Sequence, residues 1–183
     1  MSTSLGTEYL QTAIKRLRYY KMLGEKTFDQ LSDADLHYAP NGTCNSIAVI
    51  IQHMHGNMMS RWTNFLTEDG EKAWRLSDAE FEVHHQLKQQ LLTMWEEGWA
   101  RFLDTLTALK EEDLLKTVTI RQEPLTVIDA VNRQLAHYPY HVGQIIYIGK
   151  VIRNESWKNL SIEKGKSEAY NKSDGVKDPA KGM

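Results

Sequence analysis

The sequence predicts an all-α protein, a four-helix bundle, and three observations lead to this fold class. Four long segments carry apolar residues at the 3.6-residue spacing of amphipathic helices. Only one stretch, TVTI at 117–120, is β-branched, which predicts a short extended segment before the last bundle helix. After Asn154 the periodic pattern stops, so we expect a mostly irregular C-terminal segment.

Composition and charge narrow the class of protein. Hydrophobic residues make up 41% of the 183 residues and charged residues 25%, as in ordinary soluble domains. The net charge of −2 leaves no basic patch for nucleic acid, and the longest apolar run, IAVII at 47–51, is too short to span a bilayer. The single cysteine, Cys44, cannot form an internal disulfide. We therefore expect a cytoplasmic protein with a small-molecule substrate and with no nucleic-acid or membrane partner.

The first two helices are predicted from their apolar stripes. One runs from about Gly6 to Lys26, and the loop SDADLHYAPNGTCN follows it. The next begins at an Asn45–Ser46 cap and carries the clearest amphipathic pattern of the chain. The stripe of this second helix comprises Ile47, Ile50, Ile51, Met54, Met58, Trp62 and Phe65.

The last two helices are predicted in the same way. The third is expected from about Asp78 to Leu109, although Gly98 within it costs about 1 kcal/mol against Ala. The fourth starts near Thr126 and continues to Asn154. Residues 1–162 are therefore expected to form a single domain, and residues 163–183 a polar C-terminal tail.

The stretch LAHYPYHVGQII contains two histidines that a helix places on one face. His137 and His141 are four residues apart, so their Cβ atoms lie about 5–6 Å apart and both imidazoles can reach one cation. The motif lacks the glutamate of the HExxH metalloproteases. On these residues alone, a metal half-site and two ordinary surface histidines are equally favoured.

A third ligand has to come from another helix, and the second helix offers QHMHGN. His53 and His55 are two residues apart and point about 200° apart, so both cannot face one site. The helical wheel slightly favours His55, which lies nearer the apolar stripe. His84 and His85 are expected as a solvated pair near the start of the third helix, and His37 is assigned no role.

Three blocks of sequence resemble the DinB-like (DNA-damage-inducible protein B-like) superfamily. They are SIAVIIQHMHGNMMSRWTNFLTEDGEKAWR, AVNRQLAHYPYHVGQIIYIGKVI and WKNLSIEKGKSEAYN, in that order from about residue 46 to 171. They are most similar to a bacterial branch described only as a domain of unknown function. The first block and the HxGQ motif are its most distinctive parts.

This resemblance implies a four-helix bundle with a divalent metal ion, nickel or zinc, on three histidines. One histidine belongs to an H-[LM]-x-G-N context on the second helix, which HMHGN matches at His53 rather than at His55. The other two are His137 and His141 of the HxxxH motif. Asn57 and Gln144 are candidates for orienting a ligand or the substrate, and no catalytic residue is assigned beyond the metal ligands.

The resemblance implies a reaction less firmly than it implies a metal. Characterised relatives include S-transferases that use bacillithiol and mycothiol-dependent isomerases and transferases. We therefore expect a metal-dependent transferase that uses a low-molecular-weight thiol on an electrophilic small molecule. The alternatives are a metal-dependent hydrolase, a non-catalytic metal or small-molecule binding protein, and an interaction module whose histidines stabilise the bundle. Related bundles often pair, so a homodimer is expected.

The sequence departs from the superfamily pattern at two positions. Glu163 stands where a proline is usual, and Pro139 stands between the two histidines of the last helix. Because Pro139 has no N–H, the Leu135 carbonyl loses its helical partner, and we expect a bend there. The bend could tune how His137 and His141 converge, or the proline could be a neutral change.

Overall fold

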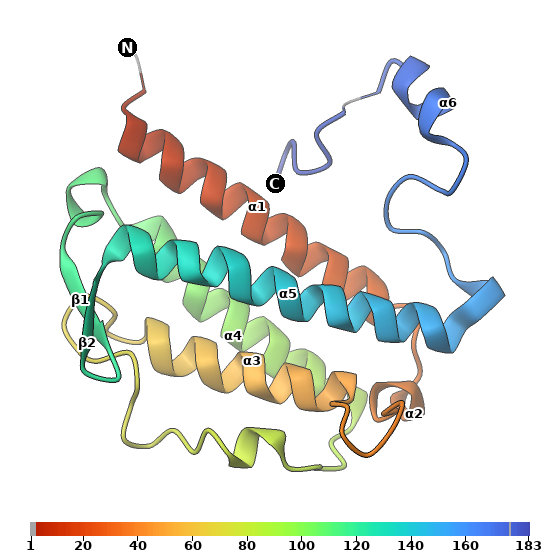
Figure 1. The fold of residues 1–183 in the computed structure, drawn as a ribbon, viewed down its shortest axis with the longest axis horizontal. Coiled ribbons are helices and arrows are strands. Elements are labelled where there is room, and N and C mark those ends of the chain that lie inside the picture. Colours follow the sequence, from red (N-terminus) through yellow and green to blue (C-terminus); the bar gives the residue numbers. More distant parts are fainter. Residues whose placement is uncertain (1–2, 176) are drawn as a thin grey trace.

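Helices account for most of the fold in the computed structural model, which describes residues 3–175 and 177–183 (Figure 1). Four long helices surround one core: α3 packs against α4 and α5, and α1 packs against the same two helices. The long helices are α1 (Leu5–Phe28), α3 (Ile47–Trp62), α4 (Lys88–Ala108) and α5 (Val127–Arg153). The shorter helices are α2 (Asp33–Leu36) and α6 (Ser167–Lys172), with 3-10 turns at Ala79–Phe81, Glu111–Asp113 and Asn154–Ser156.

Three of the long helices begin within about a residue of the predicted positions, because a side chain caps each of them. Ser4, Ser46 and Thr126 precede α1, α3 and α5 in extended conformation. The side-chain oxygen of each accepts a hydrogen bond from the backbone N–H three positions later, which satisfies one donor of the first turn.

The third long helix begins ten residues later than predicted. The sequence indicated a start near Asp78, but α4 begins at Lys88 and the preceding residues form one 3-10 turn and an extended segment. This segment lies along α3, where the Gln52 amide donates hydrogen bonds to the backbone carbonyls of Glu80 and Glu82. These carbonyls are therefore engaged by α3 instead of by a helix of their own, and the exposed His84 and His85 precede α4.

The stretch predicted to be extended is one strand of a hairpin. Strand β1 (Thr117–Ile120) pairs antiparallel with β2 (Glu123–Thr126), which was not predicted because its proline is unusual in a strand. Arg121 and Gln122 form the turn with φ of 55° and 65°, as two-residue hairpins require. The Asp69 carboxylate accepts the backbone N–H groups of both turn residues, at 2.9 and 2.8 Å, and thereby fixes the hairpin to the chain that follows α3.

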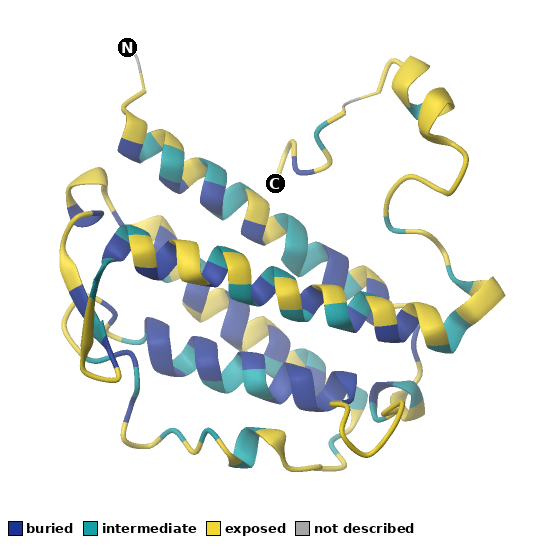
Figure 2. Cartoon of the chain, in the orientation of Figure 1, coloured by how far each residue is buried: buried dark blue, intermediate teal, exposed yellow. Residues whose placement is uncertain are grey.

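The buried faces of the long helices turn towards one another (Figure 2), and aromatic side chains pack between them. Trp62 of α3 packs on Phe102 of α4 at 4.6 Å between ring centroids, and Trp99 packs on Tyr138 of α5 at 5.8 Å. Gly98 allows this close approach, since a Cβ there would lie 3.3 Å from the backbone of His55 on α3. The tight contact between α3 and α4 offsets the helix-propensity cost of the glycine.

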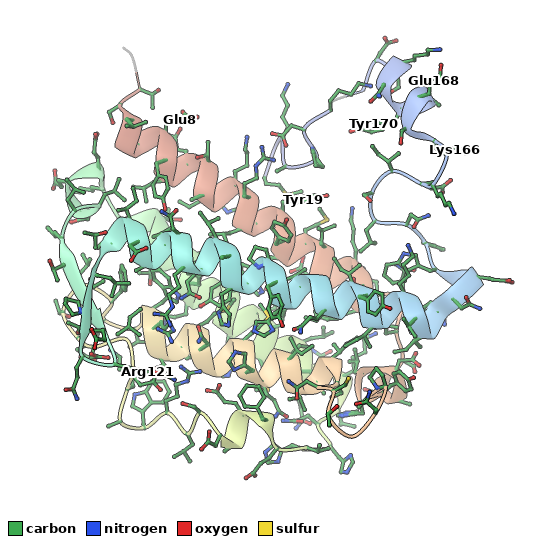
Figure 3. All side chains as sticks on the ribbon, viewed as in Figure 1. Glu8, Tyr19, Arg121, Lys166, Glu168 and Tyr170 are labelled. Atoms are coloured by element: carbon green, nitrogen blue, oxygen red, sulfur yellow. The ribbon has the colours of Figure 1, made fainter. Side chains whose placement is uncertain are left out.

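The C-terminal segment crosses back towards α1 after α5 ends. Figure 3 shows Lys166 and Glu168, at the short helix α6, pointing away from the four long helices. Asp178 then pairs with Lys15 at 3.1 Å and with Arg16 at 2.5 Å, and Ala180 is buried. Part of the predicted polar tail therefore lies against α1.

None of the helices within the described residues combines the length and the apolar character that a membrane span requires.

Candidate metal centre

The structure brings His53, His137 and His141 together. Nε2 of His137 lies 3.5 Å from Nε2 of His53 and 3.0 Å from Nε2 of His141. One nitrogen of each histidine lies within 4.8 Å of the other two, and all three rings are half-buried. Helix α3 therefore supplies one imidazole and α5 supplies two, as the resemblance implies.

The outer nitrogen of each of the three rings has an oxygen partner. Nδ1 of His53 lies 3.0 Å from a Glu80 carboxylate oxygen, Nδ1 of His137 lies 3.1 Å from Oε1 of Gln134, and Nδ1 of His141 lies 2.8 Å from Oε1 of Gln144. An acceptor oxygen at this position selects the tautomer with the proton on Nδ1. All three Nε2 lone pairs therefore face one another.

Burial keeps the imidazoles of α5 neutral. The pKa of His137 is lowered to about 3, first by burial and then by the neighbouring histidines and arginines. Burial also lowers the pKa of His141, against the opposing effect of its hydrogen bond to the Gln144 side-chain oxygen. Neutral imidazole is the form that binds a metal ion, so both side chains are ready to act as ligands at neutral pH.

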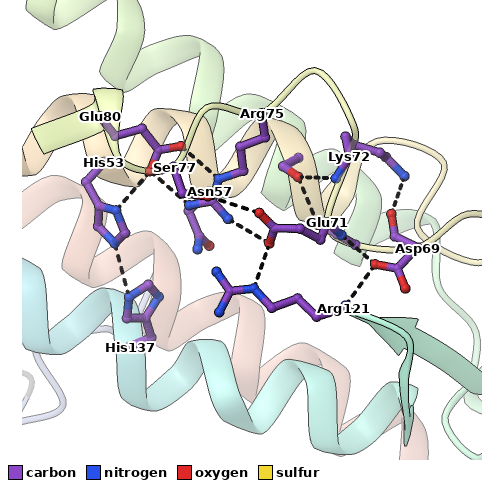
Figure 4. Close-up of polar contacts among 12 residues, drawn as sticks. His53, Asn57, Asp69, Glu71, Lys72, Arg75, Ser77, Glu80, Arg121 and His137 are labelled. Carbon is purple, nitrogen blue, oxygen red and sulfur yellow. Dashed lines mark hydrogen bonds and ion pairs between the residues drawn. The ribbon is translucent and has the colours of Figure 1, made fainter.

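A half-buried carboxylate, that of Glu80, holds the His53 ring. Figure 4 shows Glu80 between His53 and Arg75. Arg75 donates two hydrogen bonds to the carboxylate of Glu80, at 2.7 and 2.9 Å. Burial alone would raise the pKa of Glu80, but its bonds with Arg75 and His53 outweigh this effect, so the pKa is lowered and the group is ionised. The arginine thus fixes the carboxylate that orients a candidate ligand.

Gly56 makes room for this carboxylate. Gly56 lies within α3, one turn after His53 on the wheel, and a Cβ built on it would lie 2.6 Å from Cδ of Glu80. Real Cβ atoms do not approach other atoms so closely, so any larger residue would displace the glutamate. The glycine of HMHGN therefore serves the packing of Glu80 over α3.

Helix α5 continues unbroken from Val127 to Arg153 across Pro139. No interruption separates the two histidines, and the bend predicted at this position stays a prediction. Tyr138, between them, points into the core, where its hydroxyl donates to Asn57 at 3.0 Å and accepts from Trp62 at 3.1 Å. These bonds fix the rotation of α5 and hence the direction in which its histidines point.

The two residues predicted to lie near the ligands have different positions. Gln144 contacts His141 directly and also donates to the Tyr140 hydroxyl at 3.1 Å. Asn57 lines the neighbouring cavity, and its side-chain oxygen is taken by Tyr138 instead of by a histidine.

The other candidates of the sequence lie elsewhere. His55, which the helical wheel favoured, faces α4 with Nε2 3.4 Å from a Glu97 carboxylate oxygen, so this preference was wrong. Nε2 of His37 lies 2.8 Å from the backbone carbonyl oxygen of Gln86. Cys44 is exposed.

A cavity of about 340 Å³ lies beside the cluster, and His53 and His137 form part of its wall. Phe81 covers the face of His53 with ring centroids 4.8 Å apart. The wall also contains four arginines from different parts of the chain, Arg61, Arg75, Arg121 and Arg133. The candidate centre therefore adjoins a space that is large enough for a small molecule and positively charged.

Sequence reasoning missed several residues of this site. Gln134 precedes His137 by three positions, a helical spacing that could have identified it. Glu80 and Arg75 lie in the irregular segment between α3 and α4, where no periodicity predicts which side chain meets His53. The arginines carried no signal, because single arginines are common on protein surfaces.

Comparison with known proteins found one family model that matches the chain, and the matched range contains the candidate site. A family model described as "Protein of unknown function (DUF1572)" matches residues 4–166, a range that contains the three histidines, Glu80 and the four arginines. Comparisons with curated proteins and with solved structures gave no match.

Proposed function

Because the chain belongs to the family described as a protein of unknown function (DUF1572), we propose its function from the site itself. The protein binds a divalent metal ion through His53, His137 and His141 and transfers a low-molecular-weight thiol to an electrophilic small molecule. The observation that carries this proposal is the convergence of three Nε2 lone pairs on one point.

The residues fit a metal ion in spacing and in protonation. Bonds of about 2.0–2.1 Å at tetrahedral angles hold two ligand nitrogens about 3.3 Å apart. The two Nε2 separations of 3.5 and 3.0 Å bracket this value. Three lone pairs that face one another without a proton repel, and a cation between them removes the repulsion.

The side chains behind the imidazoles support the same proposal. Metal-bound histidines usually donate their second ring N–H to a carboxylate, a carbonyl or water. Glu80, Gln134 and Gln144 offer such oxygens to the three histidines. A cluster of surface histidines would have no reason to have every outer nitrogen engaged.

The proposal includes the fold and the metal. We propose that α1, α3, α4 and α5 form a bundle of the DinB-like type, with ligands from its second and last helices. Imidazole ligands suit nickel and zinc, the two metals that the resemblance implies. A homodimer is also proposed on the resemblance, and light scattering of the purified protein tests it.

The chain's own residues define where a substrate would bind. Three protein ligands leave a coordination position open, as in catalytic rather than structural zinc sites. A divalent ion there would supply the charge that deprotonates a thiol entering this position. The cavity beside His53 and His137 would hold the electrophile, and Phe81, whose ring stacks on His53, forms part of its wall.

Metal content and thiol-dependent turnover test the proposal. Elemental analysis of protein purified without chelators is expected to find about one nickel or zinc ion per chain. The loaded protein is then incubated with 1-chloro-2,4-dinitrobenzene and several thiols. Thiol-dependent turnover that His141→Ala abolishes, with the helical circular dichroism unchanged, supports the transferase.

Two other results would contradict the proposal at different levels. Hydrolysis of ester substrates without a thiol, also lost in His141→Ala, would replace the transferase with a hydrolase. No bound metal and no thermal shift with nickel or zinc would remove the metal site itself.

A further inference from the structure

Arg61 is a buried cation without a hydrogen-bond partner for most of its guanidinium. Arg61 is only 5% exposed, and its side chain lines the cavity beside the three histidines. Within residues 3–175 and 177–183, neither Nε nor Nη1 of Arg61 has a hydrogen-bond partner. An unpaired buried charge costs several kcal/mol, so such a side chain indicates that a partner is missing.

Arg133 lines the same cavity from α5. Arg61 follows His53 by eight residues on α3, and Arg133 precedes His137 by four residues on α5. Figure 1 shows that α3 and α5 run in opposite directions, so both arginines lie on the hairpin side of the histidines. The helical rise places them about 12 Å and about 6 Å from the histidine level along their helices.

Two acidic residues near the cavity, Glu71 and Glu80, are committed to the other two arginines. Glu80 pairs with Arg75. A carboxylate oxygen of Glu71, Oε2, lies 3.3 Å from Nη1 of Arg75 and 3.3 Å from Nε of Arg121 (Figure 4). None of the ion pairs among the described residues involves Arg61 or Arg133. Asp78 is the one acidic residue in the cavity wall.

Arg61 keeps its charge in spite of its burial. Burial lowers the pKa of Arg61 to about 10, and the positive charges of Arg133 and Arg75 contribute to the shift. The group therefore remains protonated at neutral pH. A planar guanidinium offers parallel N–H donors that match a carboxylate or a phosphate.

We propose that Arg61 and Arg133 bind the carboxylate or phosphate group of the small molecule whose reacting atom lies at the three histidines. The assignment of the reacting atom rests on the proposed function, whereas the anion site rests on the arginines alone. The substrate class is thus a small anion whose charged group lies several bonds from its reacting atom. Glu71 and Glu80 hold Arg75 and Arg121 in place and leave Arg61 and Arg133 for the ligand.

Anion binding to the metal-free protein tests this site separately from the metal. We would titrate inorganic phosphate and succinate into protein stripped with a chelator and follow the heat of binding. The wild-type protein should bind at least one of the two anions saturably. Arg61→Gln and Arg133→Gln should each weaken this binding about 10- to 100-fold, the effect of losing a hydrogen bond to a charged group.

A matched control and a second variant keep the result interpretable. Arg18→Gln removes an exposed arginine of α1 outside the cavity wall and should bind like the wild type. Arg133 is exposed, so Arg133→Gln tests the site even where Arg61→Gln does not fold. No saturable binding to the wild type, or equal binding by all variants, would overturn the proposal.

Assays of the zinc-bound protein then show whether the thiol or the electrophile carries the anionic group. With zinc bound, 3-mercaptopropionate is compared with 2-mercaptoethanol, and a carboxylate-bearing electrophile with its amide. A preference for the charged thiol that Arg133→Gln abolishes places the anionic group on the thiol, and the same result with the electrophiles places it there. Selectivity for neither charged compound would overturn the assignment.

The two proposals fail in distinguishable ways. Zinc affinity of Arg61→Gln and Arg133→Gln is measured in the same preparations and should equal that of the wild type. Zinc binding without anion binding would overturn the anion site alone. Anion binding without zinc binding would overturn the metal centre and leave the arginine site standing.

Discussion

The imidazole of His53 and the carboxylate of Glu80 lie 3.0 Å apart, although 27 positions separate them in the chain. Glu80 in turn accepts two hydrogen bonds from Arg75. The irregular segment between α3 and α4, which carries Glu80 and Arg75, therefore fixes the orientation of the His53 ring on α3. The first prediction follows from this contact.

Glu80→Gln should weaken metal binding about 10- to 100-fold, because the loss of a carboxylate behind a histidine ligand typically has this effect. The measurement is competition with a chromophoric chelator. Glu82→Gln, two positions away and exposed, is the matched control and should bind as the wild type does. Equal affinities of Glu80→Gln and Glu82→Gln would show that the carboxylate does not act on the site.

Gly56→Ala should reduce both metal affinity and the free energy of unfolding. Alanine favours a helix over glycine by about 1 kcal/mol, but its Cβ would meet the carboxyl group of Glu80 and displace it. Gly143→Ala on α5 is the control, because a Cβ there meets nothing within 4 Å. Chemical denaturation should show that Gly143→Ala stabilises the protein by about 0.5–1 kcal/mol while Gly56→Ala does not.

His53→Ala should weaken metal binding at least about 100-fold, since it removes a ligand instead of a residue behind one. His55→Ala removes the same group two positions away, where the imidazole faces Glu97 on α4. Titration with nickel and zinc should leave the affinity of His55→Ala unchanged. Comparable losses in the two variants would contradict the assignment of the ligand on α3.

Pro139→Ala should raise the free energy of unfolding by as much as about 3 kcal/mol. Helix α5 continues through Pro139, so alanine restores the missing backbone N–H and removes the ring from an otherwise regular turn. Denaturant unfolding of the metal-free protein measures the change. An unchanged or lower stability would mean that the surroundings of α5 already compensate for the proline.

Asp69→Asn should destabilise the protein at neutral pH by about 1 kcal/mol or more, because the carboxylate accepts three backbone N–H groups. Burial raises the pKa of Asp69, but the N–H groups of Glu71, Gln122 and Arg121 outweigh it and lower the pKa to about 2. A lowered pKa means that the contribution is full above the ordinary value of 3.8 and is lost as the pH falls through about 2. Urea unfolding at several pH values should therefore show wild type and variant converging near pH 2.

The helices and two of the three converging histidines could be predicted because both depend on local spacing. Ser46 and Thr126 mark helix starts, and His137 and His141 share a face by their separation of four residues. Spacing failed for the third histidine. The apolar stripe favoured His55, whereas α3 is so deeply buried that its less apolar side, with His53, also faces other parts of the chain.

Residues 78–87 were wrongly predicted as helical because their conformation depends on a distant side chain. Gln52 of α3 binds the carbonyls of Glu80 and Glu82, and no local pattern contains this information. The same holds for Arg61, whose proposed role depends on a cavity formed by four separate segments.

The position of Tyr138 between His137 and the core has a consequence for protein engineering. Its hydroxyl is bound by Trp62 and Asn57, so the turn of α5 that carries both histidines is anchored to α3 through the protein interior. A mutant library that varies the packing around Trp62 would therefore also vary the angle at which His137 meets His53. At these interior positions, selection for the proposed metal affinity and selection for thermal stability would act on the same residues.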